Sequence, residues 1–164
     1  MTFYASGPLL GANLTDFGTT QLYPLGTITQ GKDATYGVGE FIYLKGIGST
    51  VAGSWVSYDQ AGTTAFLSAL HSTALSKPRS VAVAMSACVA SNYGWYQISG
   101  IATVVKANTV SYAAAAALAA SAGNAIAAAS GLMISGALVA IVASAKSDVT
   151  SVKVMINRPH GPRN

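Results

Sequence analysis

Charged side chains are scarce in this sequence: Asp, Glu, Lys and Arg make up 9% of its 164 residues, whereas soluble domains typically carry about 25%. A folded chain of this mass exposes on the order of 7,500 Å², so the nine basic and five acidic residues leave about 500 Å² of surface per charge. Such a surface is typical of a protein that other subunits cover, or that Ser, Thr, Gly and Ala coat. We therefore expect an oligomer within a larger assembly.

Cysteine and clustered basic residues are also lacking. The one cysteine, Cys88, excludes an intrachain disulfide, and we interpret it as a small buried apolar residue. The nine basic residues are scattered along the chain, which favours a solvated surface over a nucleic-acid interface. The first residues hold no basic segment that would begin a signal peptide.

Catalytic and metal-binding signatures are missing as well. The two histidines, His71 and His160, are far apart, and neither belongs to an H-E-x-x-H motif or has a cysteine partner. The glycine pairs at 37–39 and 46–48 lack the other residues of a dinucleotide or Walker loop. No G-x-S-x-G nucleophile elbow occurs. We predict no enzyme activity, no cofactor and no metal.

Short segments that alternate between apolar and polar residues dominate what is present. They are separated by glycine-bearing turns, and no regular helix is indicated between them. The segments are "GTITQG", "EFIYLKG", "SWVSYD", "SVAVAMSAC", "GWYQISGIATVVKA" and "SVKVMI". This pattern predicts an all-β domain over residues 26–164, either a small β-barrel or a β-sandwich.

The longest of these segments, "YGWYQISGIATV" at 93–104, combines three aromatic residues with a glycine in its interior. Alternation places Trp95 and Tyr96 on opposite faces of a strand, and Gly100 marks a bend or a close approach of another backbone. We expect Trp55, Trp95, Tyr96 and Ile98 to form the core around this bend. A ligand-binding wall built from Trp55, Trp95 and Tyr96 is the alternative, but buried aromatic residues are more commonly plain core.

Residues 1–25 have no sustained periodicity, yet they are too apolar for a free disordered tail. We interpret them as an extended N-terminal arm that lies on a partner or in a groove between subunits. Its predicted anchors are its large apolar side chains, namely Leu9, Leu10, Leu14, Phe17, Leu22 and Tyr23.

Two segments do not fit the strand pattern. Residues 63–76 suit a short helix or a long loop equally well. Residues 113–143 carry no charge, but their many Ala, Ser and Gly residues and the break at Gly123-Asn124 argue against a membrane span. Propensity predicts a helix over 113–122, and β-branched residues predict a strand over 133–142. We expect the uncharged segment to be buried or to face another subunit.

Several short motifs are spread along the chain, namely Asn13-Leu14, "QLYPLGT" at 21–27, "FIY" at 41–43, "GWYQISGIA" at 94–102, Ile134-Ser135-Gly136 and "INRP" at 156–159. Together they resemble the capsid decoration (cement) proteins of tailed bacteriophages. The resemblance covers most of the chain, although the Ala-rich run at 113–129 is unusual for the group.

The resemblance implies a barrel-like domain with an N-terminal arm, usually trimeric, that binds the outside of the major capsid lattice and stabilises it. Its partners would then be the major capsid protein and copies of itself, with no nucleic acid, membrane or small-molecule ligand, and it would reside on the exterior of the virion. Three alternatives remain open: another virion component such as a head fibre or tail-tube protein, a membrane-active protein that uses residues 113–143, and a small-ligand-binding barrel.

Overall fold

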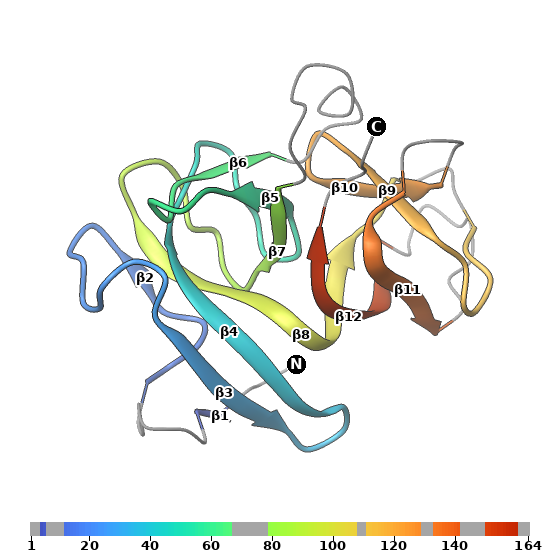
Figure 1. The fold of residues 1–164 in the computed structure, drawn as a ribbon, viewed down its shortest axis with the longest axis horizontal. Coiled ribbons are helices and arrows are strands. Elements are labelled where there is room, and N and C mark those ends of the chain that lie inside the picture. Colours follow the sequence, from blue (N-terminus) through green and yellow to red (C-terminus); the bar gives the residue numbers. More distant parts are fainter. Residues whose placement is uncertain are drawn as a thin grey trace.

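The chain folds into antiparallel β-structure, and the residues that the structure describes contain no helix (Figure 1). In this computed structural model the described residues are 4–5, 12–66, 79–107, 111–128, 133–141 and 150–160. The all-β prediction is therefore confirmed.

Twelve strands are described, and every segment predicted as a strand contains one. They are β1 (Tyr4–Ala5), β2 (Phe17–Gly18), β3 (Ile28–Asp33), β4 (Gly37–Lys45), β5 (Trp55–Tyr58), β6 (Thr64–Phe66), β7 (Ser80–Ala84), β8 (Tyr93–Val105), β9 (Leu118–Ser121), β10 (Asn124–Ala127), β11 (Ser135–Ile141) and β12 (Ser151–His160).

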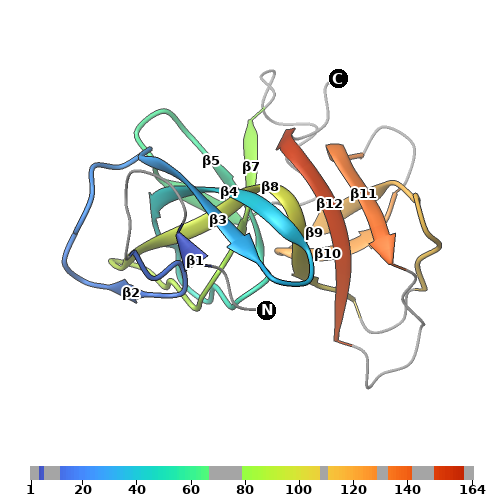
Figure 2. The same ribbon diagram turned by 90° about the horizontal axis from the view of Figure 1, so that it is seen from below.

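Ten of these strands form one sheet, and β9 and β10 form a separate hairpin. The sheet runs in the order β1-β3-β4-β8-β12-β7-β5-β6, with β11 added beside β12 and β2 beside β8. Strand β8 crosses the molecule and belongs to both halves: β2, β3 and β4 lie on one side, and β9 to β12 lie on the other (Figure 2).

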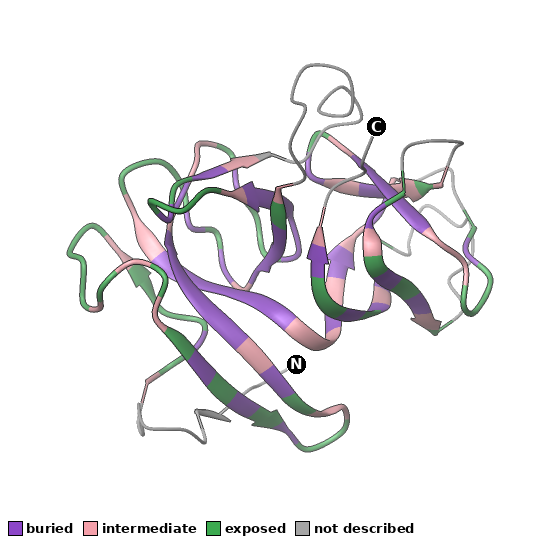
Figure 3. Cartoon of the chain, viewed as in Figure 1, coloured by how far each residue is buried: buried purple, intermediate pink, exposed green. Residues whose placement is uncertain are grey.

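Buried residues recur along most of the strands (Figure 3), and they form three clusters in the interior. The largest lies between the sheet and the β9–β10 hairpin, and it includes Trp55, Val81, Val104, Leu118 and Val154. A second fills the curl of the sheet and consists of Ile42, Leu44, Val56, Ala82, Ala84, Cys88, Tyr96 and Ile98. The third consists of Leu14, Phe41, Tyr43 and Trp95. Strands β5 and β7 are buried on both faces, because their alternate side chains enter different clusters.

The sheet curls, but it does not close into a barrel. Residue Thr63, just before β6, approaches Lys45 at the end of β4 through one isolated bridge, and no continuous ladder joins the two strands. Of the two predicted architectures, the structure is compatible with the sandwich and not with a closed barrel. The β9–β10 hairpin supplies the second layer over the largest cluster.

The helix predicted for residues 113–122 is wrong. Residues 118–121 form β9, which pairs with β10 through a turn in which Ala122 and Gly123 have φ values of 48° and 81°. Two consecutive residues with positive φ are typical of a two-residue hairpin turn. The helical preference of alanine is small per residue, and burial of Leu118 and Ala120 against the sheet outweighs it. The strand predicted at 133–142 is confirmed as β11.

Candidate functional site

The third cluster is the most aromatic part of the molecule. Trp95, at 2% exposure, packs its ring 5.1 Å from that of Tyr43 and 5.4 Å from that of Tyr23, measured between ring centroids. Tyr23 and Tyr43 meet edge to face at 5.2 Å, and Tyr93 stacks on Tyr43 at 6.5 Å. These separations are those of favourable aromatic pairs, so the cluster is a packed unit.

A loop formed by residues 12–23 lies against this cluster and is held at several points. Asn13 Oδ1 accepts hydrogen bonds from the backbone N–H and the hydroxyl of Thr15, which is an Asx turn. Strand β2 then pairs with the start of β8. Further along, the Leu22 N–H donates to the Tyr43 hydroxyl at 3.2 Å. Burial raises the pKa of Tyr43 above its ordinary value, so its phenol stays protonated and neutral here.

Between the loop and the aromatic rings lies a pocket of about 440 Å³. The loop contributes its walls, and the rings of the cluster contribute its floor. Its lining residues are Ala12, Asn13, Asp16, Phe17, Gly18, Thr19, Thr20, Leu22, Tyr23, Tyr43, Tyr93 and Trp95. Among the described residues that line the pocket, Asp16 is the single carboxylic acid, and none is Lys, Arg or His.

The predicted arm anchors differ in how far they are buried. Leu14 is fully buried and Tyr23 is half-buried, both in the aromatic cluster of their own chain. Phe17 and Leu22 remain exposed. Leu9 and Leu10 lie outside the described residues. Part of the predicted arm is thus packed on the body of the chain, and its binding to a partner stays a prediction.

The predicted core residues are buried. Trp55, Trp95, Tyr96 and Ile98 have almost no exposed surface, and Trp95 and Tyr96 enter different clusters on opposite faces of β8. Gly100 has φ of +95°, and a Cβ there would lie 2.7 Å from the Val38 carbonyl oxygen. Both features agree with the predicted bend and close approach. Just before it, Glu40 faces Ser99 and Phe41 faces Gln97, which leaves Ile98 as the extra residue of a bulge.

Cys88 is buried in the second cluster. Burial raises the pKa of its thiol, and burial also raises the pKa of the neighbouring Tyr96 phenol. A thiol held in its neutral form is a poor nucleophile. This agrees with the interpretation of Cys88 as a small apolar core residue.

An exposed apolar row crosses three strands of the sheet. Leu138 on β11 is the register partner of Met155 on β12, and Met155 is in turn the partner of Ile101 on β8. Leu138 and Met155 are 49% and 48% exposed, and Ile141, also on β11, is exposed. We call Ile101, Leu138, Ile141 and Met155 the apolar row. The sequence analysis did not find it, because only the strand register brings residues 101, 138 and 155 side by side.

Part of the uncharged segment 113–143 belongs to the chain's own core. Its residues Leu118, Ala120, Ala125, Ile134, Ala137 and Val139 lie in the largest cluster. Of its described large apolar residues, Met133, Leu138 and Ile141 are exposed. Within the described part of the segment, the argument that other subunits must cover it therefore rests on these three side chains.

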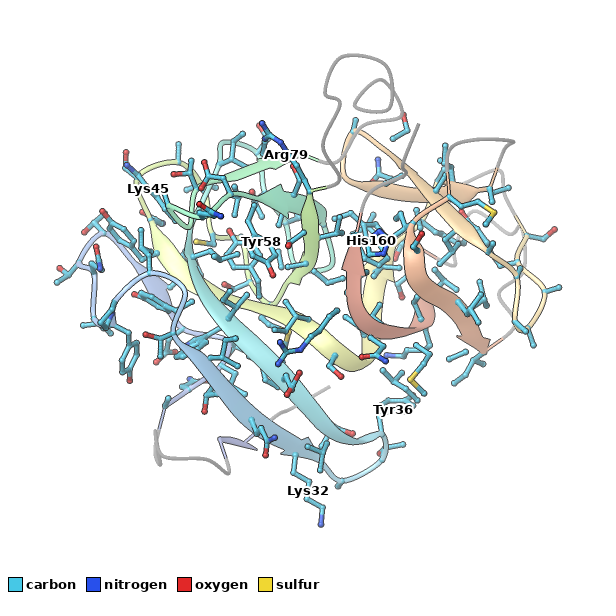
Figure 4. The ribbon with its side chains drawn as sticks, in the orientation of Figure 1. Lys32, Tyr36, Lys45, Tyr58, Arg79 and His160 are labelled. Carbon is cyan, nitrogen blue, oxygen red and sulfur yellow. The ribbon has the colours of Figure 1, made fainter. Side chains whose placement is uncertain are left out.

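Charged groups are dispersed rather than gathered, and among the described ones Asp33 and Lys106 are buried. Figure 4 shows Lys32, Lys45 and Arg79 at separate edges of the molecule. Lys153 donates to the Thr103 hydroxyl, and its Nζ lies 5.0 Å from the centre of the Tyr36 ring. Burial lowers the pKa of Lys153, while the negative charge of Asp33 raises it.

Within the described part of the chain no three metal-ligating side chains lie together, and no helix has the length and hydropathy of a membrane span.

No protein-family model, curated protein or solved structure matches the chain. The fold, the pocket and the apolar row are therefore the observations on which any functional proposal rests.

Proposed function

We propose that this chain is a capsid decoration protein of a tailed bacteriophage, a structural protein without catalytic activity. It would assemble as a homotrimer on the outside of the major capsid lattice and stabilise that lattice. The virion exterior would be its location, after assembly in the host cytoplasm.

The observation that carries this proposal is the apolar row on a rigid sheet of a chain with very few charges. Half-exposed apolar side chains that lie side by side on a regular surface mark a protein contact. The motifs of the resemblance add support, since Leu14, Tyr23, Tyr43 and Trp95, which come from four of them, meet in the aromatic cluster.

The two exposed surfaces suit two different contacts. The apolar row lies on the C-terminal half, where it would contact neighbouring copies. Phe17 and Leu22 lie on the loop at the opposite side of β8, where they would contact the capsid. Full burial of one such side chain stabilises a contact by roughly 1.5–3 kcal/mol, and many copies on a lattice add avidity.

Capsid binding is tested by mixing the purified protein with undecorated capsids and imaging the particles by cryo-electron microscopy. We expect density on the outer surface of the shell. Density in a tail tube or a head fibre, or no association with shells at all, would contradict the proposal. The double variant Phe17→Ser with Leu22→Ser should bind shells more weakly, whereas Val51→Ser, an equally exposed valine on another loop, should bind as the parent does.

The subunit contact is tested by light scattering at micromolar concentration. The parent should have the mass of a trimer, and Leu138→Asp combined with Met155→Asp should give a folded monomer, because two carboxylates would then face a neighbouring copy. A parent that is monomeric in solution, or a variant that stays trimeric, would remove the apolar row from this role.

A further inference from the structure

The pocket beneath loop 12–23 shares Phe17 and Leu22 with the proposed capsid contact, but neither that contact nor core packing uses its aromatic floor and its polar groups. A loop that served only to cover apolar rings would lower its free energy by closing onto them. Instead, pairing of β2 with β8 and the bond from Leu22 to Tyr43 hold the loop around a hollow of about 440 Å³. We propose that this pocket is a binding site for a neutral saccharide.

The size and the floor of the pocket suit a sugar ring. Small-ligand pockets have volumes of roughly 300–1,000 Å³ and pre-formed, largely apolar walls. Tyr23 and Tyr93 line the pocket and are only half-buried, so each keeps part of its ring surface free. Because the face of an aromatic ring is negative, it attracts the positively polarised C–H groups on one side of a pyranose.

The rim provides hydrogen-bonding groups, of which one is charged. Asn13, Thr19 and Thr20 contribute an amide and two hydroxyls, and Asp16 contributes one carboxylate. Hydroxyl groups of a sugar can donate to all of these and can accept from the amide and the two Thr hydroxyls. Because none of the described residues that line the pocket is cationic, a phosphate, a carboxylate or a nucleotide would face Asp16 without a compensating charge from them.

The arrangement of the rings also argues against an organic cation. A cation-binding aromatic cage needs open ring faces around the charge. Here Tyr43 and Trp95 are buried and meet at 62°, so only Tyr23 and Tyr93 keep free ring surface, and two rings do not surround a charge. Asp16 also already accepts a hydrogen bond from Asn13 at 2.7 Å. The sequence analysis predicts no small-molecule ligand, and the proposal departs from it on the geometry of this pocket.

The test uses the full-length protein, and the side-chain N–H signal of Trp95 reports on the pocket. It is titrated with the methyl pyranosides of glucose, galactose, mannose and N-acetylglucosamine, with inorganic phosphate and with tetramethylammonium. We expect saturable shifts with at least one sugar, with a dissociation constant in the millimolar range, near −4 kcal/mol. No saturable shift with any of the four sugars, or tighter binding of phosphate or tetramethylammonium, would overturn the proposal.

Variants then locate the site. Thr20→Ala removes an exposed hydroxyl and should weaken sugar binding about fivefold through one lost hydrogen bond, and Tyr93→Ala should abolish it. Tyr36→Ala removes another half-buried tyrosine, outside the pocket, and should bind sugar as the parent does. Unchanged affinity in both Thr20→Ala and Tyr93→Ala would place the sugar elsewhere and overturn the assignment. None of these measurements involves capsids, so their outcome is independent of the proposed function.

Discussion

Trp95 shows at the scale of one residue how a single side chain supports the candidate site. Its ring is 2% exposed and packs among Leu14, Phe41 and Tyr43, at the point where the loop meets the sheet. Removing it would leave a cavity that the surrounding rings, fixed by β4 and β8, cannot fill by small shifts.

We predict that Trp95→Ala lowers the free energy of unfolding by about 3–5 kcal/mol, as large-to-small changes in a well-packed core do. Urea denaturation followed by circular dichroism measures this. Phe17→Ala, at an exposed position of the same loop, is the control and should change stability by less than about 1 kcal/mol. A Trp95→Ala variant as stable as the parent that lost only capsid binding would show that the ring is a contact residue instead.

At the scale of the element, β8 decides the architecture. Its first half pairs with β4 and its second half with β12, so the strand must change direction between them. The bulge at Ile98 and the positive φ of Gly100 supply this change, and the absence of a side chain at Gly100 lets the Val38 and Gly39 backbone approach.

We predict that Gly100→Ala destabilises the fold by about 2 kcal/mol or more, since it combines a left-handed conformation with a clash against backbone. Gly48→Ala is the matched control, because a Cβ at Gly48 would meet nothing within 4 Å. Thermal unfolding of the two variants beside the parent makes the comparison. Equal melting temperatures for the two would mean that β8 bends without help from Gly100.

At the scale of the whole molecule, buried Cys and Tyr side chains make the free energy of unfolding depend on pH. Burial raises the pKa values of Cys88, Tyr96, Tyr43 and Tyr112 in the folded chain. Above the unfolded pKa values, which are about 8.5 for Cys and about 10 for Tyr, the folded state therefore holds more protons than the unfolded state, and stability falls as pH rises. Burial lowers the pKa of Lys153, which gives one smaller contribution of opposite sign.

We predict a melting temperature that is nearly constant between about pH 7 and 8 and that falls above about pH 9. Differential scanning calorimetry across this range measures it. The fall should begin at higher pH in Cys88→Ala, because the group with the lowest unfolded pKa is then absent. A melting temperature that holds or rises up to about pH 11 would contradict the burial of these groups.

The sequence by itself determined the strands that alternate, the buried aromatic residues of β8 and the bend at Gly100. Alternation and glycine conformation are local properties, so a short stretch carries all the information that they need. The scarcity of charge likewise followed from composition alone.

Only the tertiary structure decided the rest, because it depends on which distant residues become neighbours. The pairing register of β11 and β12 places Leu138 beside Met155. Residues 118–121 form a strand instead of a helix because Leu118 and Ala120 are buried against the sheet. Leu14 and Phe17 are three residues apart in the sequence, but Leu14 packs against the aromatic rings of β4 and β8 while Phe17 stays exposed. The pocket arises in the same way, since its floor and its walls are joined only where the loop returns to the sheet.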